Sequence, residues 1–431
     1  MTETRLEAHY CDGWDPATRS SVRPLPRAEA ERRDAAGEPY AVVFRAPGRE
    51  QPVAVLHLAR AGQYAELHRL DPQGRRTFEI DLRALEPGRL FLRHLTEWRY
   101  ERPEQPDRAT DAWRKVLLLL PDGRGRQTVN DRGDGGGSYQ TAADLPVESR
   151  WLPDPRFGHW AELLAVGRLG GTGPLPEITE PPLDPAPPQP AGPAEPFGWR
   201  PPRPATPPWP EELFTPGATF AHRFRAGTVT VEPPRTITEI ALPSGRLAVH
   251  DPLHLGRDEP IVIEVPPGSY PVQESRSSFG RPGGNANGAN PIGADAIGES
   301  YALRVLVSGK PPASWTPAVP PGGDPRLLGD GECFGFGTDS ATGSFADADA
   351  RPSLSARYKQ YLTSRVKDGV ETFDYSYAKV TDAGTGAGLL GFPLGGDGTV
   401  PVWIGRDTDG AVAAVVVPDP FEVYVLEPAV G

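Results

Sequence analysis

Cysteine is scarce in this chain of 431 residues, since only Cys11 and Cys333 are present. The two lie far apart and in no metal-ligand spacing, which excludes a disulfide framework and a cysteine-based zinc site. No stretch approaches the roughly 18 apolar residues that a membrane-spanning helix needs, and the first residues contain no apolar signal core. We therefore expect a cytoplasmic protein that does not enter a membrane, with export only by a signal-independent route.

Complete catalytic motifs are missing as well. Residues 243–245, Pro-Ser-Gly, lack the Gly-x-Ser-x-Gly elbow of serine hydrolases. Residues 335–340 do not complete a dinucleotide fingerprint, and Lys310 precedes two prolines, which rules out a phosphate-binding loop. No His-Glu-x-x-His sequence occurs. The sequence therefore predicts no cofactor, and it leaves open whether the protein is an enzyme while leaning against it.

Proline, by contrast, is abundant and locally concentrated. Of the 53 prolines, 16 fall between residues 174 and 210. Proline lacks the backbone donor and fixes φ, so such a segment is typical of an extended spacer. We predict an α+β meander domain over 1–168, a proline-rich linker over 169–212 and a β-rich domain over 213–431. Trp199 and Trp209 are the residues by which the linker would dock onto a neighbouring domain.

Charge is distributed as unevenly as proline. Residues 1–168 carry 26 basic and 26 acidic side chains, whereas residues 211–431 carry 17 basic and 27 acidic ones, a net charge of −10. A surface of that sign repels phosphate backbones and so disfavours nucleic-acid binding by the second half. It favours a basic protein partner or divalent cations.

Hydrophobic patterning predicts a mainly β protein. In the first half, we expect strands at 40–45, 53–58, 64–70, 77–82, 89–100 and 116–120 and a short helix near 155–164. In the second half, nine strands are expected at 228–231, 236–242, 247–250, 261–265, 270–274, 301–307, 400–404, 412–417 and 421–426. Nine short strands separated by turn residues indicate a β-sandwich or barrel behind an α+β N-terminal module.

One covering helix is predicted at 352–366. Its expected apolar face consists of Leu354, Tyr358, Tyr361, Leu362 and Val366, with Ser353 as its cap.

Five short phrases are distinctive in the second half, and most of them combine aspartate with glycine, proline or serine. They are Pro-Ser-Gly-Arg-Leu-Ala-Val-His-Asp-Pro at 243–252, Pro-Pro-Gly-Ser-Tyr-Pro-Val at 266–272, Gly-Phe-Gly-Thr-Asp-Ser at 335–340, Asp-Ala-Asp at 347–349 and Gly-Gly-Asp-Gly at 395–398. In their order and spacing they resemble an uncharacterised bacterial family, catalogued only as a domain of unknown function, over about residues 220–426. The resemblance implies a fold and no established activity. The first half is only loosely similar to small bacterial accessory modules.

The aspartates of these phrases are candidate metal ligands. They are Asp251, Asp339, Asp347, Asp349 and Asp397. Carboxylates suit Mg²⁺, Mn²⁺ or Ca²⁺, and His250 or His254 would serve as a general base. The candidate catalytic residues are therefore His250, Asp251, Asp339 and Asp397. The alternative is that each aspartate caps a turn, which is the commoner use of aspartate next to proline, serine or glycine.

Two hypotheses about function follow. In the first, the protein is a non-catalytic binding module, such as an immunity or accessory protein in bacterial conflict, whose acidic surface binds a basic protein partner. In the second, it is a metal-dependent hydrolase or toxin-like effector that uses the aspartates and a divalent cation. The localised acidity and the missing catalytic motifs favour the first.

Overall fold

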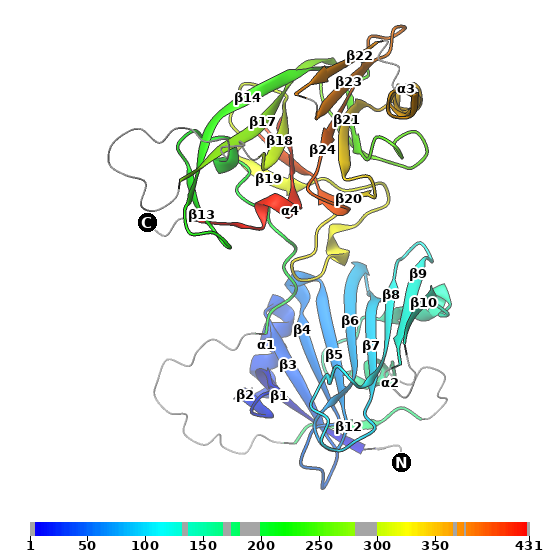
Figure 1. Ribbon diagram of the computed structural model, residues 1–431. Helices are drawn as coiled ribbons and strands as arrows, with labels where there is room; N and C mark the ends of the chain where they lie inside the picture. Colours follow the sequence, from blue (N-terminus) through cyan, green and yellow to red (C-terminus); the bar gives the residue numbers. More distant parts are fainter. Residues whose placement is uncertain are drawn as a thin grey trace. The chain divides into compact units, whose positions relative to one another are not determined.

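The computed structural model describes residues 5–131, 137–166, 174–181, 199–280, 300–364, 369–374 and 376–428. The chain divides into two compact units, Met1–Pro202 and Arg203–Gly431. Both consist mainly of antiparallel strands (Figure 1), which confirms the mainly β fold class. Within the described ranges, no helix is both long and apolar enough to cross a membrane.

The first unit is built on one twelve-stranded sheet. Strands that follow one another in the chain pair side by side from β3 to β10. β12 joins β1 in parallel, β2 pairs with β1, and β11 pairs with β7. The strands are β1 Arg5–Asp15, β2 Ser20–Leu25, β3 Tyr40–Arg45, β4 Ala54–Ala59, β5 Tyr64–Leu70, β6 Arg76–Glu86, β7 Arg89–Arg99, β8 Trp113–Leu119, β9 Gly125–Asn130, β10 Ser138–Ala142, β11 Trp151–Pro153 and β12 Glu177–Thr179.

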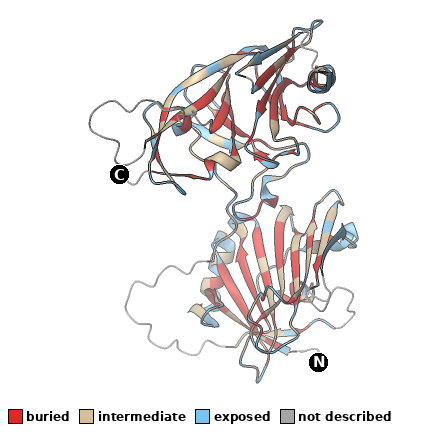
Figure 2. Cartoon of the chain, viewed as in Figure 1, coloured by how far each residue is buried: buried red, intermediate tan, exposed pale blue. Residues whose placement is uncertain are grey.

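Two α-helices accompany this sheet, α1 Arg27–Ala36 and α2 Ala161–Ala165, together with the 3-10 turns η1 Arg60–Gly62 and η2 Val147–Arg150. Phe157 and Trp160, which precede α2, cover one face of the sheet. Phe157 stacks on Tyr10 with ring centroids 5.2 Å apart, and the Nε1 of Trp160 donates to the Tyr10 hydroxyl. The apolar run of β3 is fully buried, as Figure 2 shows for the central strands.

The ends of the segment expected to be a linker belong to the units. β12 lies inside 169–212 and pairs with β1. Trp199 stacks on His57 within the first unit, with ring centroids 4.7 Å apart. Trp209 packs on Phe220 within the second unit, with centroids 5.2 Å apart. Each tryptophan therefore anchors its end of the segment, while residues 182–198 lie outside the described residues.

The second unit contains three sheets of eight, six and two strands in the described residues. The eight-stranded order is β19-β26-β27-β18-β17-β14-β13-β28, the six-stranded order is β16-β15-β21-β24-β23-β22, and β20 pairs with β25. The strands are β13 Thr219–His222, β14 Thr228–Leu242, β15 Arg246–His250, β16 Ile261–Glu264, β17 Gly268–Gly280, β18 Ala302–Leu306, β19 Ser314–Pro317, β20 Gly335–Thr338, β21 Thr342–Asp347, β22 Val370–Phe373, β23 Tyr377–Thr381, β24 Gly388–Pro393, β25 Gly398–Pro401, β26 Trp403–Arg406, β27 Val412–Pro418 and β28 Leu426–Pro428.

The second unit thus has more strands than the nine expected. Several of the additional ones are only four residues long and contain glycine or proline, such as β19, β20 and β25, so their apolar alternation is too short to detect. Two expected strands, 228–231 and 236–242, form the single strand β14, which is interrupted by register shifts opposite β17.

Helix α3, Arg351–Ser364, is the expected covering helix. It buries Leu354 and Tyr358, but Leu362 is 48% exposed, so the predicted apolar face is too wide. Val366 lies outside the described residues. Ser353 does not precede the helix but lies in its first turn, where its hydroxyl donates to Ala350 O and Asp382 Oδ2.

The expected strand at 421–426 is wrong for its first half. Residues Pro420–Val423 form the short helix α4, and only Leu426 begins a strand. Asp419 caps this helix by accepting from the Phe421 amide, and the next residue, Pro420, has a φ suited to a first helical turn. The remaining short helices are the 3-10 turns η3 Glu212–Phe214 and η4 Pro325–Leu327.

Three buried clusters hold the described residues of the second unit together, and one of them, which includes Leu354 and Tyr358, lies between the six-stranded sheet and α3. The other two involve the eight-stranded sheet. The larger lies between the eight- and six-stranded sheets and includes Val249, Val305 and Phe345. The smaller lies around β13, α4 and β28 and includes Phe214, Phe220 and Val423. The smaller cluster joins the two ends of the unit's sequence.

Candidate functional site

Asp251 is the most buried of the predicted site residues. It follows β15 and has no exposed surface. Its Oδ2 accepts from the hydroxyls of Thr338, at 3.0 Å, and Ser340, at 2.8 Å, while its Oδ1 accepts from the Leu253 amide at 2.8 Å. A buried carboxylate needs such donors, because burial without partners is costly. Asp251 therefore joins the loop after β15 to the β20–β21 turn.

His254 and Asp339 lie next to Asp251, closer to the surface. The Nε2 of His254 is 2.9 Å from Asp339 Oδ1, and its Nδ1 is 2.7 Å from an Arg257 guanidinium nitrogen. Asp251, His254 and Asp339 each offer one ligand atom, and these atoms lie within 4.8 Å of one another. The structure thus brings together two of the five predicted metal ligands and one of the two predicted bases.

Asp397 supports the same turn without joining this group. Its Oδ1 accepts from the Ala341 amide at 2.9 Å. Ala341 has a φ of 47°, a left-handed conformation that costs a non-glycine residue energy. Hydrogen bonds that this turn donates to the carboxylates of Asp251 and Asp397 compensate for that cost.

Asp347 and Asp349 lie apart from this turn, before α3. Asp347 is buried; its Oδ2 accepts from the amide and hydroxyl of Ser244, and its Oδ1 accepts from the amides of Asp349 and Ala350. Asp349 pairs with Arg246 at 2.5 Å. These two aspartates tie the 243–245 turn to the helix start.

His250 faces the core and not the Asp251 group. Its ring is 9% exposed and lies 6.1 Å from the Phe336 ring, and its backbone carbonyl accepts from the Ser344 hydroxyl at 2.7 Å. The Nδ1 of His250 lies 3.3 Å from the Asp251 carbonyl oxygen, so its contact with Asp251 is to the backbone and not to the carboxylate.

Three contributors to the site were not predicted, namely Thr338, Ser340 and Asp419. Thr338 and Ser340 both lie within the 335–340 phrase, in which only Asp339 was predicted to be a site residue. Asp419 accepts from the Gly395 amide at 2.6 Å and so anchors the 395–398 phrase. Burial raises the pKa of the Asp419 carboxyl.

A pocket of about 520 Å³ lies elsewhere in the second unit, where β16, β18 and β26 end. Its lining includes Lys310, Arg406 and Asp407 and none of the predicted site residues. Lys310 pairs with Asp407 at 3.4 Å and with Asp409 at 2.6 Å, so its charge is already matched.

Comparison with known proteins gives one family match. A domain described as a protein of unknown function (DUF4241) matches residues 240–417. This agrees with the resemblance of the second half to an uncharacterised domain family. No curated protein matches the chain, and neither does a solved structure.

Proposed function

We propose that the second unit is a non-catalytic binding module that presents a rigid set of acidic loops to a basic protein partner. The acidic loop set consists of Asp258, Glu259, Asp339 and Asp397. All four are exposed. The observation that carries the proposal is that Asp251, fully buried, uses its carboxylate to join the loop of Asp258 and Glu259 to the turn of Asp339, which Asp397 contacts in turn.

Contacts connect three members of the acidic loop set, and the fourth, Glu259, follows Asp258 in the chain. His254 lies between Asp339, at 2.9 Å, and Asp258, at 3.6 Å. Asp397 binds the amide two residues after Asp339. Arg257 is the one arginine that contacts this set, through Asp258, so the four acids outnumber their basic neighbours among the described residues.

Rigidity matters because a partner then does not have to order the loops. Binding to preorganised loops loses less conformational entropy than binding to mobile ones. Complementary charge speeds the encounter and selects partners. Both effects fit a surface whose buried aspartates are engaged in holding turns.

A cationic peptide tests the proposal. Fluorescence anisotropy at low salt would compare a labelled oligolysine with an oligoglutamate of equal length. Exposed charge pairs contribute about 0.2–1 kcal/mol each, so neutralising the four loop acids to Asn or Gln should weaken oligolysine binding by roughly tenfold. Added salt should weaken wild-type binding as well.

The matched control neutralises four other exposed acids of the second unit: Glu212, Glu371, Asp409 and Glu427. This variant has the same net charge as the loop variant. If the two variants lose affinity equally, only net charge matters and the acidic loop set is not a binding surface.

A metal-dependent hydrolase is the second candidate, because Asp251, His254 and Asp339 have ligand atoms within 4.8 Å of one another. Against it, all the oxygens of Asp251 already accept hydrogen bonds from neutral donors. Mn²⁺-dependent hydrolysis of bis(p-nitrophenyl) phosphate that is lost in His254→Ala would favour the hydrolase. Metal-independent stability and no turnover would favour the binding module.

A further inference from the structure

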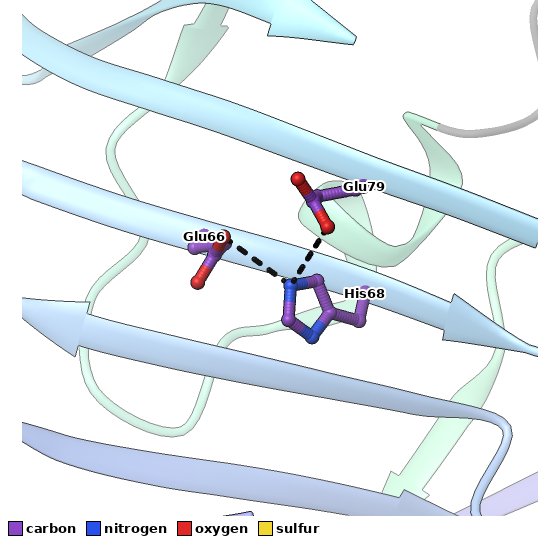
Figure 3. Close-up of side chains that lie close together, drawn as sticks. All are labelled: Glu66, His68 and Glu79. Atoms are coloured by element: carbon purple, nitrogen blue, oxygen red, sulfur yellow. Dashed lines mark ion pairs between the residues drawn. The ribbon is translucent and has the colours of Figure 1, made fainter. Parts of the chain in front are cut away.

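A second cluster of titratable side chains lies on the sheet of the first unit (Figure 3). Glu66 and His68 are alternate residues of β5, so both side chains project from the same face. Glu79 on β6 is the cross-strand partner of His68. The pairing register thus gathers one imidazole and two carboxylates.

Their spacing is close to that of a metal site. The Nε2 of His68 lies 3.3 Å from Glu66 Oε1 and 3.9 Å from Glu79 Oε2, and one ligand atom from each residue falls within 4.8 Å of the others. Around a tetrahedral zinc ion with ligands at about 2.0–2.1 Å, the ligand atoms are about 3.3 Å apart. The His68–Glu66 separation already has this value, and the His68–Glu79 separation of 3.9 Å is somewhat longer.

Unpartnered imidazole nitrogens supply an independent observation. Neither ring nitrogen of His57 has a hydrogen-bond partner, and the Nε2 of His68 has none either. His57 is 2% exposed, is the cross-strand partner of Glu66, and holds its Nδ1 3.9 Å from Glu66 Oε2. Native proteins seldom bury polar atoms without partners. The Nε2 of His68, which makes no hydrogen bond and faces two carboxylates, therefore points to a missing cation.

Glu66 is oriented by its surroundings. The Nε1 of Trp199 donates to Glu66 Oε2 at 2.7 Å, which leaves Oε1 directed toward His68. The Trp199 ring stacks on His57. Groups that hold a ligand from behind in this way are typical of metal sites.

The charges around the cluster permit a dication. Arg76 and Arg108 both donate to Glu79 Oε2, and Asp107 pairs with Arg76. Three carboxylates and two guanidinium groups leave one net negative charge when the imidazoles are neutral. A carboxylate has about four acceptor positions, so Glu79 retains its Oε1.

We propose that Glu66, His68 and Glu79 form a binding site for a divalent transition-metal ion of the zinc class. One imidazole with two carboxylates suits Zn²⁺ better than Mg²⁺ or Ca²⁺. Three protein ligands leave a fourth position for water. The three side chains are 12–19% exposed, so an ion has access from solvent. This site is independent of the binding function proposed for the second unit.

Zinc and cobalt titrations of the full chain test the proposal. After treatment with EDTA and removal of the chelator, Zn²⁺ affinity would be measured by competition with a chromogenic chelator, and Co²⁺ binding by visible d–d absorption. We expect one equivalent in the wild type, with the intense bands of a four-coordinate ion. Mg²⁺ and Ca²⁺ should not compete.

Variants separate this site from others. His68→Gln should weaken Zn²⁺ binding at least 100-fold and remove the cobalt bands. Trp199→Phe retains all three ligands but loses the Glu66 hydrogen bond, so it should weaken binding about tenfold. His9→Ala, on β1 of the same sheet, and His254→Ala, in the second unit, are matched controls that should bind as the wild type does.

Circular dichroism in EDTA checks that each variant folds. If Trp199→Phe and the controls fold but the wild type takes up no Zn²⁺ or Co²⁺, the cluster is only an ion-pair network and the proposal is wrong. It is also wrong if His68→Gln folds and binds with wild-type affinity. If only His254→Ala lost metal binding, the metal site would be assigned to the second unit instead.

Discussion

Replacing Asp251 is the sharpest test of how the second unit is held together. Asp251→Ala removes a fully buried carboxylate and three hydrogen bonds, two from hydroxyls and one from an amide. Hydrogen bonds to charged groups contribute about 1.5–3 kcal/mol each. The full sum is an upper limit, because the Thr338 hydroxyl can still donate to Thr342 O at 3.1 Å. We expect a loss of about 3–5 kcal/mol in the free energy of unfolding.

Asp251→Asn refines this prediction. In this variant the side-chain oxygen can still accept from the Leu253 amide. The side-chain nitrogen, which is a donor, would face the Thr338 and Ser340 hydroxyls, which are donors to Asp251 in the wild type. Thr338 cannot easily reverse its role, because its oxygen already lies near the amides of Ser340 and Thr342, at 3.3 and 3.2 Å. We expect an intermediate loss of about 1–3 kcal/mol.

Urea denaturation in EDTA measures both losses, and limited proteolysis of the second unit reports local opening. Asp258→Asn is the control, since Asp258 is exposed and accepts no hydrogen bond from the β20–β21 turn. An unfolding free energy for Asp251→Ala within about 1 kcal/mol of the wild type would refute the reasoning, because losses of that size are ordinary for surface changes.

Three further predictions concern other parts of the chain. Gly245→Ala should lower the free energy of unfolding of the second unit by at least about 2 kcal/mol, as measured by urea denaturation. Gly245 has a φ of 70°, and an added Cβ would lie 2.7 Å from the Val265 carbonyl oxygen. An unchanged free energy of unfolding would contradict this prediction. Burial raises the pKa of the Asp107 carboxyl, but hydrogen bonds from Arg76 outweigh it, so the pKa lies below the usual value. The stabilisation from Asp107 is therefore fully present above the ordinary aspartate pKa of about 4 and lost as the pH falls through the lowered pKa, and Asp107→Asn should flatten the acid limb of the stability curve. Burial raises the pKa of Cys11 to about 12 and also raises that of Cys333, so a thiol reagent at pH 8 should modify Cys333 slowly and Cys11 only after unfolding.

Sequence patterns predicted the strands well and the side-chain partners poorly. The run at 40–45 is β3 because five apolar or aromatic residues in a row suit a buried strand. The run at 421–426 looked equally β-prone, but a local cap at Asp419 starts a helix there. The sequence contains a helix-capping signal, Asp419-Pro420. The prediction gave more weight to the β-branched residues Val423 and Val425 that follow it.

The candidate sites show what a sequence cannot reveal. That Asp251 would accept from Thr338 and Ser340 depends on which strands pair, since these residues are 87 and 89 positions away. In the first unit, alternation could have placed Glu66 and His68 on one face. The addition of Glu79 requires the β5–β6 register, which a register shift at the start of β6 makes hard to foresee.

The family match and the folded unit have different limits. The matched segment, 240–417, begins near the end of β14 and stops one residue before the end of β27. β13, most of β14, and β28 lie outside it, although they belong to the same eight-stranded sheet. A fragment cut at these limits would expose an unpaired strand edge together with the remains of the cluster around Phe220 and Val423. Such an edge recruits other chains, so recombinant expression of the matched segment alone should yield aggregates, and the longer piece 203–428, which keeps β13, β14 and β28, is the one to express.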